Sequence, residues 1–208
     1  MRSLDWLTFA YRLKDLPREG WRMRGVRDPE SVAAHAWGTA LLCVLFADEA
    51  GVPRGEAVEI AVAHDLAEAD IGDVASLADP SLRTVSEAEK TRLEAAAMAD
   101  LTARWPGAAA ERIAARWQAY ENRDSATALF VRDMNLIDMC LQAYLYERDL
   151  RYRPDPESPL FAGATPEGRD GLREFFASAD VRLSTPVGRE LFASLREAYR
   201  ALAEGVDG

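Results

Sequence analysis

The stretch AVAHDLAEADIGDV, residues 61–74, decides how this sequence is interpreted. It places His64 directly before Asp65 in an alanine-rich segment that favours a helix, and Glu68 follows one helical turn later. The 208-residue chain contains two histidines. The other one, His35, lies in ESVAAHAW, residues 30–37, which is also alanine-rich. We therefore predict that two neighbouring helices carry the two imidazoles.

These side chains have the chemistry of a metal site. On one helix, His64 and Asp65 point about 100° apart, so both reach one point only in a groove against another helix, where His35 can face them. Neutral imidazoles and carboxylates are ligands of borderline divalent cations, and three protein ligands leave positions open for water and substrate. Glu68 is placed to hold that water or to pass a proton. The alternative interpretation is an ordinary helix-surface ion pair between His64 and Asp65.

Capping residues and apolar spacing predict helices along nearly the whole chain. The expected helices, in chain order, are one begun by Asp28, Pro29 and Glu30 that runs to about Ala50, one from about Arg54 to Glu68, one capped by Ser86 with Glu89, one from about Ser125 to Leu150, and a last one begun by Thr185 and Pro186 that ends before Gly205. Loops are expected at residues 77–84 and in the proline-rich segment 151–167.

The longest expected helix carries an apolar stripe at three- and four-residue steps, formed by Phe130, Met134, Ile137, Leu141 and Leu145. The sequence contains no alternation typical of strands, no internal repeat and no low-complexity linker. We therefore predict an all-α protein with a single domain, residues 1–208. Its bundle core spans about residues 4–150, and a C-terminal loop and helices span residues 151–208.

Charge and composition narrow the choice of partners and compartment. With 25 basic and 35 acidic residues, the formal net charge of −10 disfavours binding to nucleic acid polymers. A small phosphorylated substrate remains compatible, because a bound cation reverses the local field. No apolar run reaches the roughly 20 residues that span a bilayer, and Asp5 interrupts the segment where a signal peptide would be apolar. Cys43 and Cys140 are expected to be reduced core thiols. We therefore predict a cytoplasmic protein.

Four separated blocks resemble the HD-domain metal-dependent phosphohydrolases, and most closely the branch of HD domain-containing protein 2 and the bacterial 5′-deoxynucleotidases. The blocks are LPREGWRMRGVRDPESVAAHAW (16–37), AVAHDLAEADIGDVA (61–75), SEAEKTRLEAAAM (86–98) and FVRDMNLIDMCLQAYLYE (130–147). The resemblance implies a helical HD fold that is usually a homodimer. It also implies hydrolysis of deoxynucleoside 5′-monophosphates to deoxynucleoside and phosphate, with a cation such as Co²⁺, Mn²⁺ or Mg²⁺.

By the same resemblance, His35, His64 and Asp65 match the first three metal ligands of the family. The resemblance also implies roles for other single residues. Glu68 matches the carboxylate near the attacking water, and Asp73 matches the acidic residue of the Gly-Asp turn; both are described as ligands of a second cation in some members. Arg18 and Trp21 match the segment that closes over phosphate and sugar. An arginine suits a phosphate clamp, whereas Trp21 is equally well explained as a core aromatic.

One position departs from the family pattern. The last ligand of the family is an aspartate in the long helix, and by alignment that position is Asn135. An amide oxygen can coordinate a metal but brings no charge, so Asn135 is expected to hold the cation more weakly. Asp138, one turn further along the helix, is expected to assist from beside Asn135. The alternative for Asp138 is a hydrogen-bonded polar residue near the dimer or substrate surface.

We therefore predict a metal-dependent 5′-nucleotidase. Two alternatives remain at this point. One is hydrolysis of a modified nucleotide in a specialised pathway. The other is a nucleotide-binding protein with a weakened metal site, which Asn135 favours and the intact His35, His64 and Asp65 oppose. A di-iron HD oxygenase is disfavoured, because such sites need more histidines than the two present.

Overall fold

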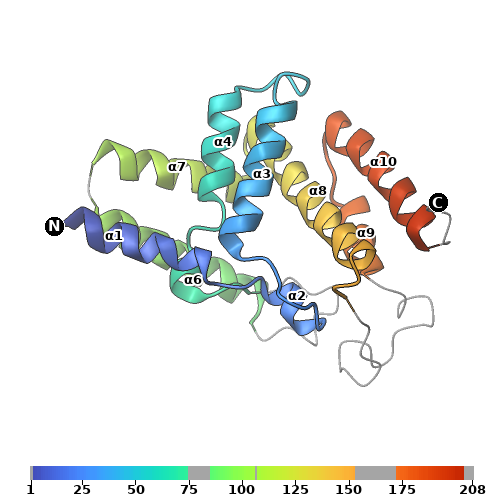
Figure 1. The fold of residues 1–208 in the computed structure, drawn as a ribbon. Helices are drawn as coiled ribbons and strands as arrows, with labels where there is room; N and C mark the ends of the chain where they lie inside the picture. Colours follow the sequence, from blue (N-terminus) through green and yellow to red (C-terminus); the bar gives the residue numbers. More distant parts are fainter. Residues whose placement is uncertain (1, 75–84, 106, 153–171, 204–208) are drawn as a thin grey trace.

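The computed structural model describes residues 2–74, 85–105, 107–152 and 172–203, and these described residues form helices and connecting loops (Figure 1). The elements are α1 (Arg2–Ala10), η1 (Tyr11–Lys14), α2 (Glu19–Met23), α3 (Val32–Phe46), α4 (Arg54–Ala63), α5 (Glu68–Ile71), α6 (Glu87–Arg104), α7 (Ala108–Asn122), α8 (Ala126–Arg148), α9 (Arg173–Asp180) and α10 (Pro186–Ala203). No strand occurs among them, and an isolated antiparallel bridge pairs Pro17 with Ser31. The predicted all-α class is confirmed.

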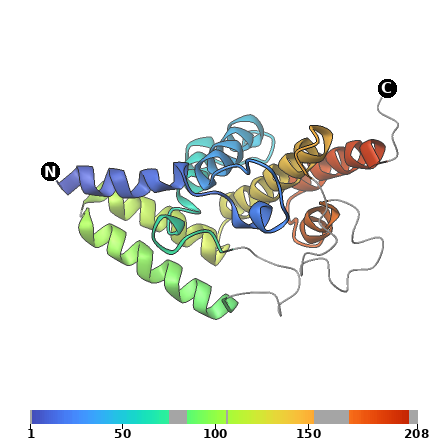
Figure 2. The ribbon, with the colours of Figure 1, turned by 60° about the horizontal axis from the view of Figure 1, so that its bottom comes forward.

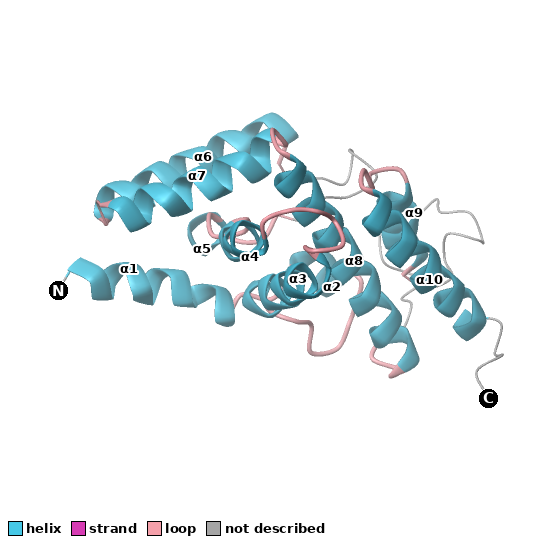
Figure 3. Cartoon of the chain, turned by 90° about the horizontal axis from the view of Figure 1, so that it is seen from above, coloured by secondary structure: helices cyan, strands magenta, loops and turns pink. Residues whose placement is uncertain are grey.

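The long helix α8 is the central element of the arrangement. It packs against α3, α4 and α7, and its other neighbours are α9 and α10. The helices α3 and α4 lie side by side in front of α8 in Figure 1. In Figure 2 the helices α1 and α10 lie at opposite ends of the molecule, and Figure 3 shows α6 and α7 as a pair that packs beside α4. The short α5 packs against α6, so the segment after α4 is enclosed by helices.

The start of α3 differs from the prediction. Asp28 has a backbone φ of 47°, which is the left-handed region and not the extended conformation of an N-cap. The chain instead stays extended up to Ser31, because Arg18 N–H donates to the Glu30 carbonyl at 2.9 Å. Ser31 caps α3 by accepting the N–H of Ala34 at 3.2 Å. The helix therefore begins one turn later than Asp28 suggested.

The expected helix from Arg54 to Glu68 is divided in two. α4 ends at Ala63, and residues 64–67 form a turn before α5 begins at Glu68. In this turn the N–H groups bond to carbonyls three residues back, as from Glu68 N to Asp65 O at 3.0 Å. Such bonds tighten the chain relative to an α-helix. The tightened turn includes His64 and Asp65, two of the candidate ligands.

Three predicted helix starts are confirmed, and several predicted segments lie outside the described residues. Ser86 accepts the N–H of Glu89, Ser125 accepts that of Ala128, and the Thr185 hydroxyl accepts that of Gly188. The predicted loop at residues 77–84 lies outside the described residues, as does the predicted loop at residues 151–167 except for residues 151 and 152, which are non-helical. Among the helices that are described, none has both the length and the apolar composition that crossing a bilayer requires.

The core stripe predicted for α8 is correct in its first half only, where it buries Phe130, Met134 and Ile137. Leu141 is 37% exposed and Leu145 is half-buried. The second half instead buries Cys140, Ala143 and Tyr146. This face turns toward α9 and α2, since the Cys140 thiol contacts the Phe175 carbonyl and the ring of Tyr146 contacts that of Trp21.

Two buried clusters form the core, and α3 contributes to both. Val32 belongs to the cluster that includes Leu66 and Trp117, and Cys43 belongs to the cluster built around α8. His35 lies between these two positions on α3 and is itself 0% exposed. The first candidate ligand is therefore held at the junction of the two clusters.

Candidate metal centre and active site

The two histidines present free ring nitrogens to the same point. The His64 Nδ1 lies 2.7 Å from the carbonyl of Ala61, which can only accept, so this nitrogen carries a proton. The His35 Nδ1 lies 2.6 Å from Oδ2 of Asp138. Both Nε2 atoms are buried, and neither has a hydrogen-bond partner among the described residues. Buried polar atoms are rarely left without a partner, so two such atoms facing one point indicate a missing ligand.

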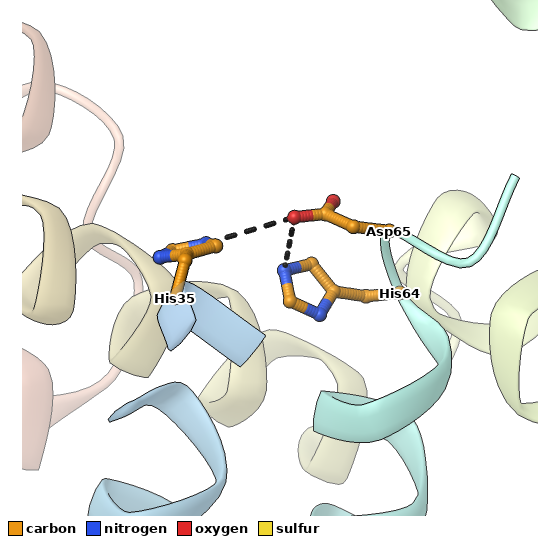
Figure 4. Close-up of side chains that lie close together, drawn as sticks. All are labelled: His35, His64 and Asp65. Atoms are coloured by element: carbon orange, nitrogen blue, oxygen red, sulfur yellow. Dashed lines mark ion pairs between the residues drawn. The ribbon is translucent and has the colours of Figure 1, made fainter. Parts of the chain in front are cut away.

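Asp65 completes the cluster, as Figure 4 shows. Its Oδ2 lies 3.1 Å from Nε2 of His64 and 3.7 Å from Nε2 of His35. One ligand atom from each of the three residues lies within 4.8 Å of the others. The turn at residues 64–67 brings the Asp65 carboxylate to the same side as His64, and α3 supplies His35 from the facing helix. The two-nitrogen, one-oxygen set fits a borderline divalent cation.

Burial and neighbouring charges set the protonation of the ligands. Burial, together with the charge of Arg18, lowers the pKa of His35 to about 3, so this imidazole is neutral as a ligand must be. Burial acts against the charge of His64, but the Asp65 carboxylate outweighs it and raises the pKa of His64. Burial likewise opposes ionisation of Asp65, yet His64, His35 and Arg18 lower its pKa. Asp65 is therefore ionised, as a carboxylate ligand would have to be.

Glu68 lies beside this cluster, and its pKa is shifted in the opposite direction from the pKa of Asp65. Its side chain is buried, and Oε2 has no hydrogen-bond partner among the described residues. Burial, followed by the charges of Asp65 and Asp73, raises the pKa of Glu68 well above its ordinary value. A buried carboxyl group with a raised pKa beside a candidate metal position suits a general acid or base.

Arg18 and Asp73 also lie near the cluster. Arg18 Nη1 lies 3.9 Å from Oδ2 of Asp65, and Nε lies 3.6 Å from Oδ2 of Asp73. Asp73 accepts the backbone N–H of Glu19 at 2.5 Å, which ties the turn after α5 to the start of α2. Nη1 of Arg18 is buried without a hydrogen-bond partner in the described part of the chain. A cationic donor therefore faces the candidate metal position.

Two predicted residues, Trp21 and Asn135, have hydrogen-bond partners outside the cluster of His35, His64 and Asp65. Trp21 is 1% exposed, its Nε1 donates to Glu30 at 2.9 Å, and its ring packs on Phe175. This arrangement places Trp21 in the core, so it does not support a direct sugar contact. Asn135 donates its Nδ2 to the Tyr120 hydroxyl. It remains close to the cluster through Tyr120, whose ring centroid lies 5.0 Å from that of His64.

Asp138 has a partner that sequence analysis did not identify. It was expected to stand beside Asn135, but its carboxylate contacts the ring of His35. Burial raises the pKa of Asp138 to about 7. The signal in the sequence was only a second acidic residue one turn after Asn135, and this spacing does not reveal which helix the side chain faces.

The fold and the centre define a class: an all-α protein in which two histidines and an aspartate from adjacent helices form a candidate site for a divalent cation. Residues 10–166 match the HD domain family. The chain therefore belongs to the HD domain family, which confirms the family resemblance of the four sequence blocks.

Individual relatives agree with this assignment. The 5′-deoxynucleotidase HDDC2 of Bos taurus is 37% identical over 202 residues, which are 97% of this chain and 88% of that protein. The 5′-deoxynucleotidase hdd1 of Schizosaccharomyces pombe is 33% identical over 164 residues, which are 77% of this chain and 80% of that protein. The crystal structure of the PH0347 protein from Pyrococcus horikoshii OT3 has a TM-score of 0.68 and 26% identity, covering 95% of this chain and 98% of that chain.

Proposed function

We propose that this HD-domain protein is a metal-dependent phosphomonoester hydrolase that converts deoxynucleoside 5′-monophosphates to deoxynucleosides and phosphate. The observation that carries the proposal is the convergence of His35, His64 and Asp65, with one ligand atom from each within 4.8 Å. The similar proteins named 5′-deoxynucleotidase support the substrate class.

His35, His64 and Asp65 would hold the cation, for which Co²⁺, Mn²⁺ and Mg²⁺ are the candidates. Asn135 is the proposed fourth ligand, through its carbonyl oxygen, because its Nδ2 is already used by Tyr120. When bound, a divalent cation supplies neutralising charge for phosphoryl oxygens and lowers the pKa of a water molecule.

Glu68 and Arg18 carry the remaining chemistry. Oε2 of Glu68 accepts a proton from the attacking water while the water oxygen forms a bond to phosphorus. The bond between phosphorus and the 5′-oxygen breaks, and the proton held on Glu68 is available to this departing oxygen. Arg18 binds the phosphoryl oxygens as their charge is redistributed during the reaction. Asp73 orients Arg18, because its carboxylate faces the Nε of the guanidinium group. Trp21 supports substrate binding indirectly by anchoring α2 in the core.

The arginine role is tested by a matched pair of variants in one segment. Arg18→Ala removes the buried guanidinium that faces the centre, and Arg22→Ala removes an exposed one whose partner is Glu19. We expect kcat/KM for deoxynucleoside monophosphates to fall about 100-fold in the first variant, the usual effect of losing one donor to a transition-state oxygen. Arg22→Ala should stay within about twofold of the wild type. Equal activities in the two variants would remove Arg18 from the mechanism.

Asn135 favours a second candidate function, a nucleotide-binding protein with a weakened metal site. Its side chain is uncharged where the family carries an aspartate, and it is bonded to Tyr120. Measurement of nucleotide binding and turnover on the same preparation separates the two functions. Binding of deoxynucleoside monophosphates without phosphate release, at saturating cation, would favour the binding protein.

We also propose a homodimer that pairs through α3. Its 15 residues, VAAHAWGTALLCVLF, contain no charged side chain, and a helix that is apolar on all sides is normally buried. The outward face nevertheless exposes Trp37 (69%), Leu41 (40%), Val44 (45%) and Leu45 (60%), and Leu141 of α8 is 37% exposed. A second copy that presents the same helix would cover this face by a two-fold, self-complementary contact.

Two further assignments remain proposals. We propose that residues 1–208 form a single domain, which the packing of α8 against helices from both halves of the chain supports. We also propose a cytoplasmic location, which the two free, buried cysteines, Cys43 and Cys140, support. The partner is a small nucleotide and not a nucleic acid polymer, in keeping with the net charge of −10.

A further inference from the structure

Asp138 and His35 form a buried pair on the side of the imidazole that faces away from the candidate metal position. Oδ2 of Asp138 lies 2.6 Å from Nδ1 of His35, and the two side chains are 13% and 0% exposed. The other ring nitrogen, Nε2, lies 3.7 Å from Oδ2 of Asp65. The ring of His35 is therefore held between a carboxylate from α8 and the carboxylate that joins the metal centre.

Gly38 makes room for this pair. A Cβ atom at position 38 would lie 2.0 Å from Oδ1 and 2.9 Å from Cγ of Asp138. A Cβ atom cannot approach a non-bonded atom this closely. Any residue other than glycine at position 38 would therefore displace the Asp138 carboxylate. Gly38 follows His35 by one turn of α3, which places the missing side chain where Asp138 enters.

The pair determines which nitrogen of His35 can bind a cation. A neutral imidazole carries one N–H, and a carboxylate at 2.6 Å from Nδ1 stabilises the form with the proton on Nδ1. Nε2 then keeps its lone pair for the metal. The same logic holds for His64, but there the acceptor is the backbone carbonyl of Ala61. The tautomer of His35 thus depends on the side chain of Asp138. This side chain, unlike the backbone carbonyl at His64, can be changed by mutation.

We propose that Asp138 is a positioning residue that holds His35 in the Nδ1–H form with Nε2 directed at the metal centre, and that Gly38 is required because it admits the Asp138 carboxylate. The proposal rests on the proposed function in so far as His35 binds a cation. It assigns Asp138 to the histidine and not to the cation itself. Partners of this kind commonly change metal affinity 10- to 100-fold when removed.

The first test reads the proton position in metal-free protein. Because the chain has two histidines, protein labelled with ¹⁵N-histidine gives two imidazole spectra. In the wild type we expect His35 to be protonated at Nδ1. Asp138→Ala should lose this preference, and Asp138→Asn should retain it, because the amide oxygen can still accept. His64 serves as the internal reference, since a backbone carbonyl holds its Nδ1. An unchanged His35 spectrum in folded Asp138→Ala would overturn the proposal.

The second test measures cation affinity. We expect Asp138→Ala to bind Co²⁺ or Mn²⁺ about 10- to 100-fold more weakly in calorimetric titrations, and Asp138→Asn to lose less. Affinity equal to wild type in Asp138→Ala would contradict the proposal. If wild-type protein binds no cation, the proposed function fails. The ¹⁵N spectra then still decide whether Asp138 sets the proton position.

The third test links Gly38 to Asp138. Gly38→Ala should change the His35 spectrum and the cation affinity as Asp138→Ala does. Combined with Asp138→Ala, the same glycine substitution should have little further effect, because no carboxylate remains to be displaced. Circular dichroism and thermal unfolding establish that each variant is folded. Equal effects of Gly38→Ala in both backgrounds would show that Gly38 does not act through Asp138.

Discussion

Asn135 is the proposed fourth ligand, and its effect on cation binding can be measured. Asn135→Asp adds a carboxylate beside the centre, whose Coulomb attraction of about 4 kcal/mol at 4 Å is largely offset by desolvation. We expect cation binding to tighten about tenfold, which corresponds to roughly 1.4 kcal/mol. The measurement is a calorimetric titration with Mn²⁺.

A matched asparagine provides the control. Asn122 on α7 is exposed and bonded to Gln118, so Asn122→Asp adds the same charge on the surface and outside the cluster. It should leave the affinity unchanged. If Asn135→Asp binds no more tightly than Asn122→Asp, Asn135 is not a ligand.

At the scale of residues, spacing in the sequence was enough to predict the cluster of His35, His64 and Asp65. The helical pattern places His35 and His64 on neighbouring helices, and the turn at residues 64–67 brings Asp65 to the same point. The surroundings of Trp21 and Asp138 could not be predicted in the same way. Each depends on which of two packed helices the side chain faces, and this is decided by core packing and not by the local pattern.

At the scale of elements, Asp133 fastens the start of α10 to α8. Asp133 is fully buried and accepts the backbone N–H groups of Ser184 and Thr185 at 2.7–3.1 Å, together with both hydroxyls. The Asp133 carboxylate lies directly against the backbone of α10, because a Cβ at Gly188 would overlap with it. We expect Asp133→Ala to lower the free energy of unfolding by about 3 kcal/mol, since buried donors lose their acceptor.

Urea unfolding measures this loss, and Asp180→Ala is the control. Asp180 pairs with Arg196 on the surface and should contribute far less. Equal losses in the two variants would show that Asp133 does not anchor α10.

The division between α4 and α5 shows what sequence patterns miss at this scale. Residues 54–68 contain no proline, and their one glycine, Gly55, lies at the start, so the sequence predicts a continuous helix. The helix nevertheless ends at Ala63 and tightens through residues 64–67. This turn lies at the metal centre, where bringing His64 and Asp65 to one point opposes regular helix geometry. Capping residues, in contrast, correctly predicted the starts of α6, α8 and α10.

At the scale of the whole molecule, the apolar face of α3 predicts association. Leu45→Glu places a charge on the most exposed aliphatic residue of this face, at 60% exposure, where the fold of one copy should be unaffected. We expect this variant to be monomeric in analytical ultracentrifugation at a concentration where the wild type is dimeric. Val181→Glu, at a position that is 84% exposed near α9, is the matched control and should remain dimeric. A Leu45→Glu protein that stays dimeric would exclude the α3 interface.

The all-α architecture was predictable because nearly every segment carries helix caps and helical spacing, while no segment alternates like a strand. The change along α8 in which helices pack against it was not predictable from the sequence. Its apolar stripe reads continuously from Phe130 to Leu145, yet the buried face shifts near Leu141. Partner helices that lie far apart in the sequence cause the shift.

Metal-dependent phosphate release is the decisive measurement for the proposed hydrolase activity. Protein stripped of metal is incubated with a panel of deoxynucleoside and nucleoside 5′-monophosphates, with and without added Co²⁺, Mn²⁺ or Mg²⁺. His64→Ala, shown to be folded, is measured in parallel. The account predicts phosphate release from deoxynucleoside monophosphates that requires added cation and is abolished in His64→Ala. Release without cation, or full activity in His64→Ala, would contradict it.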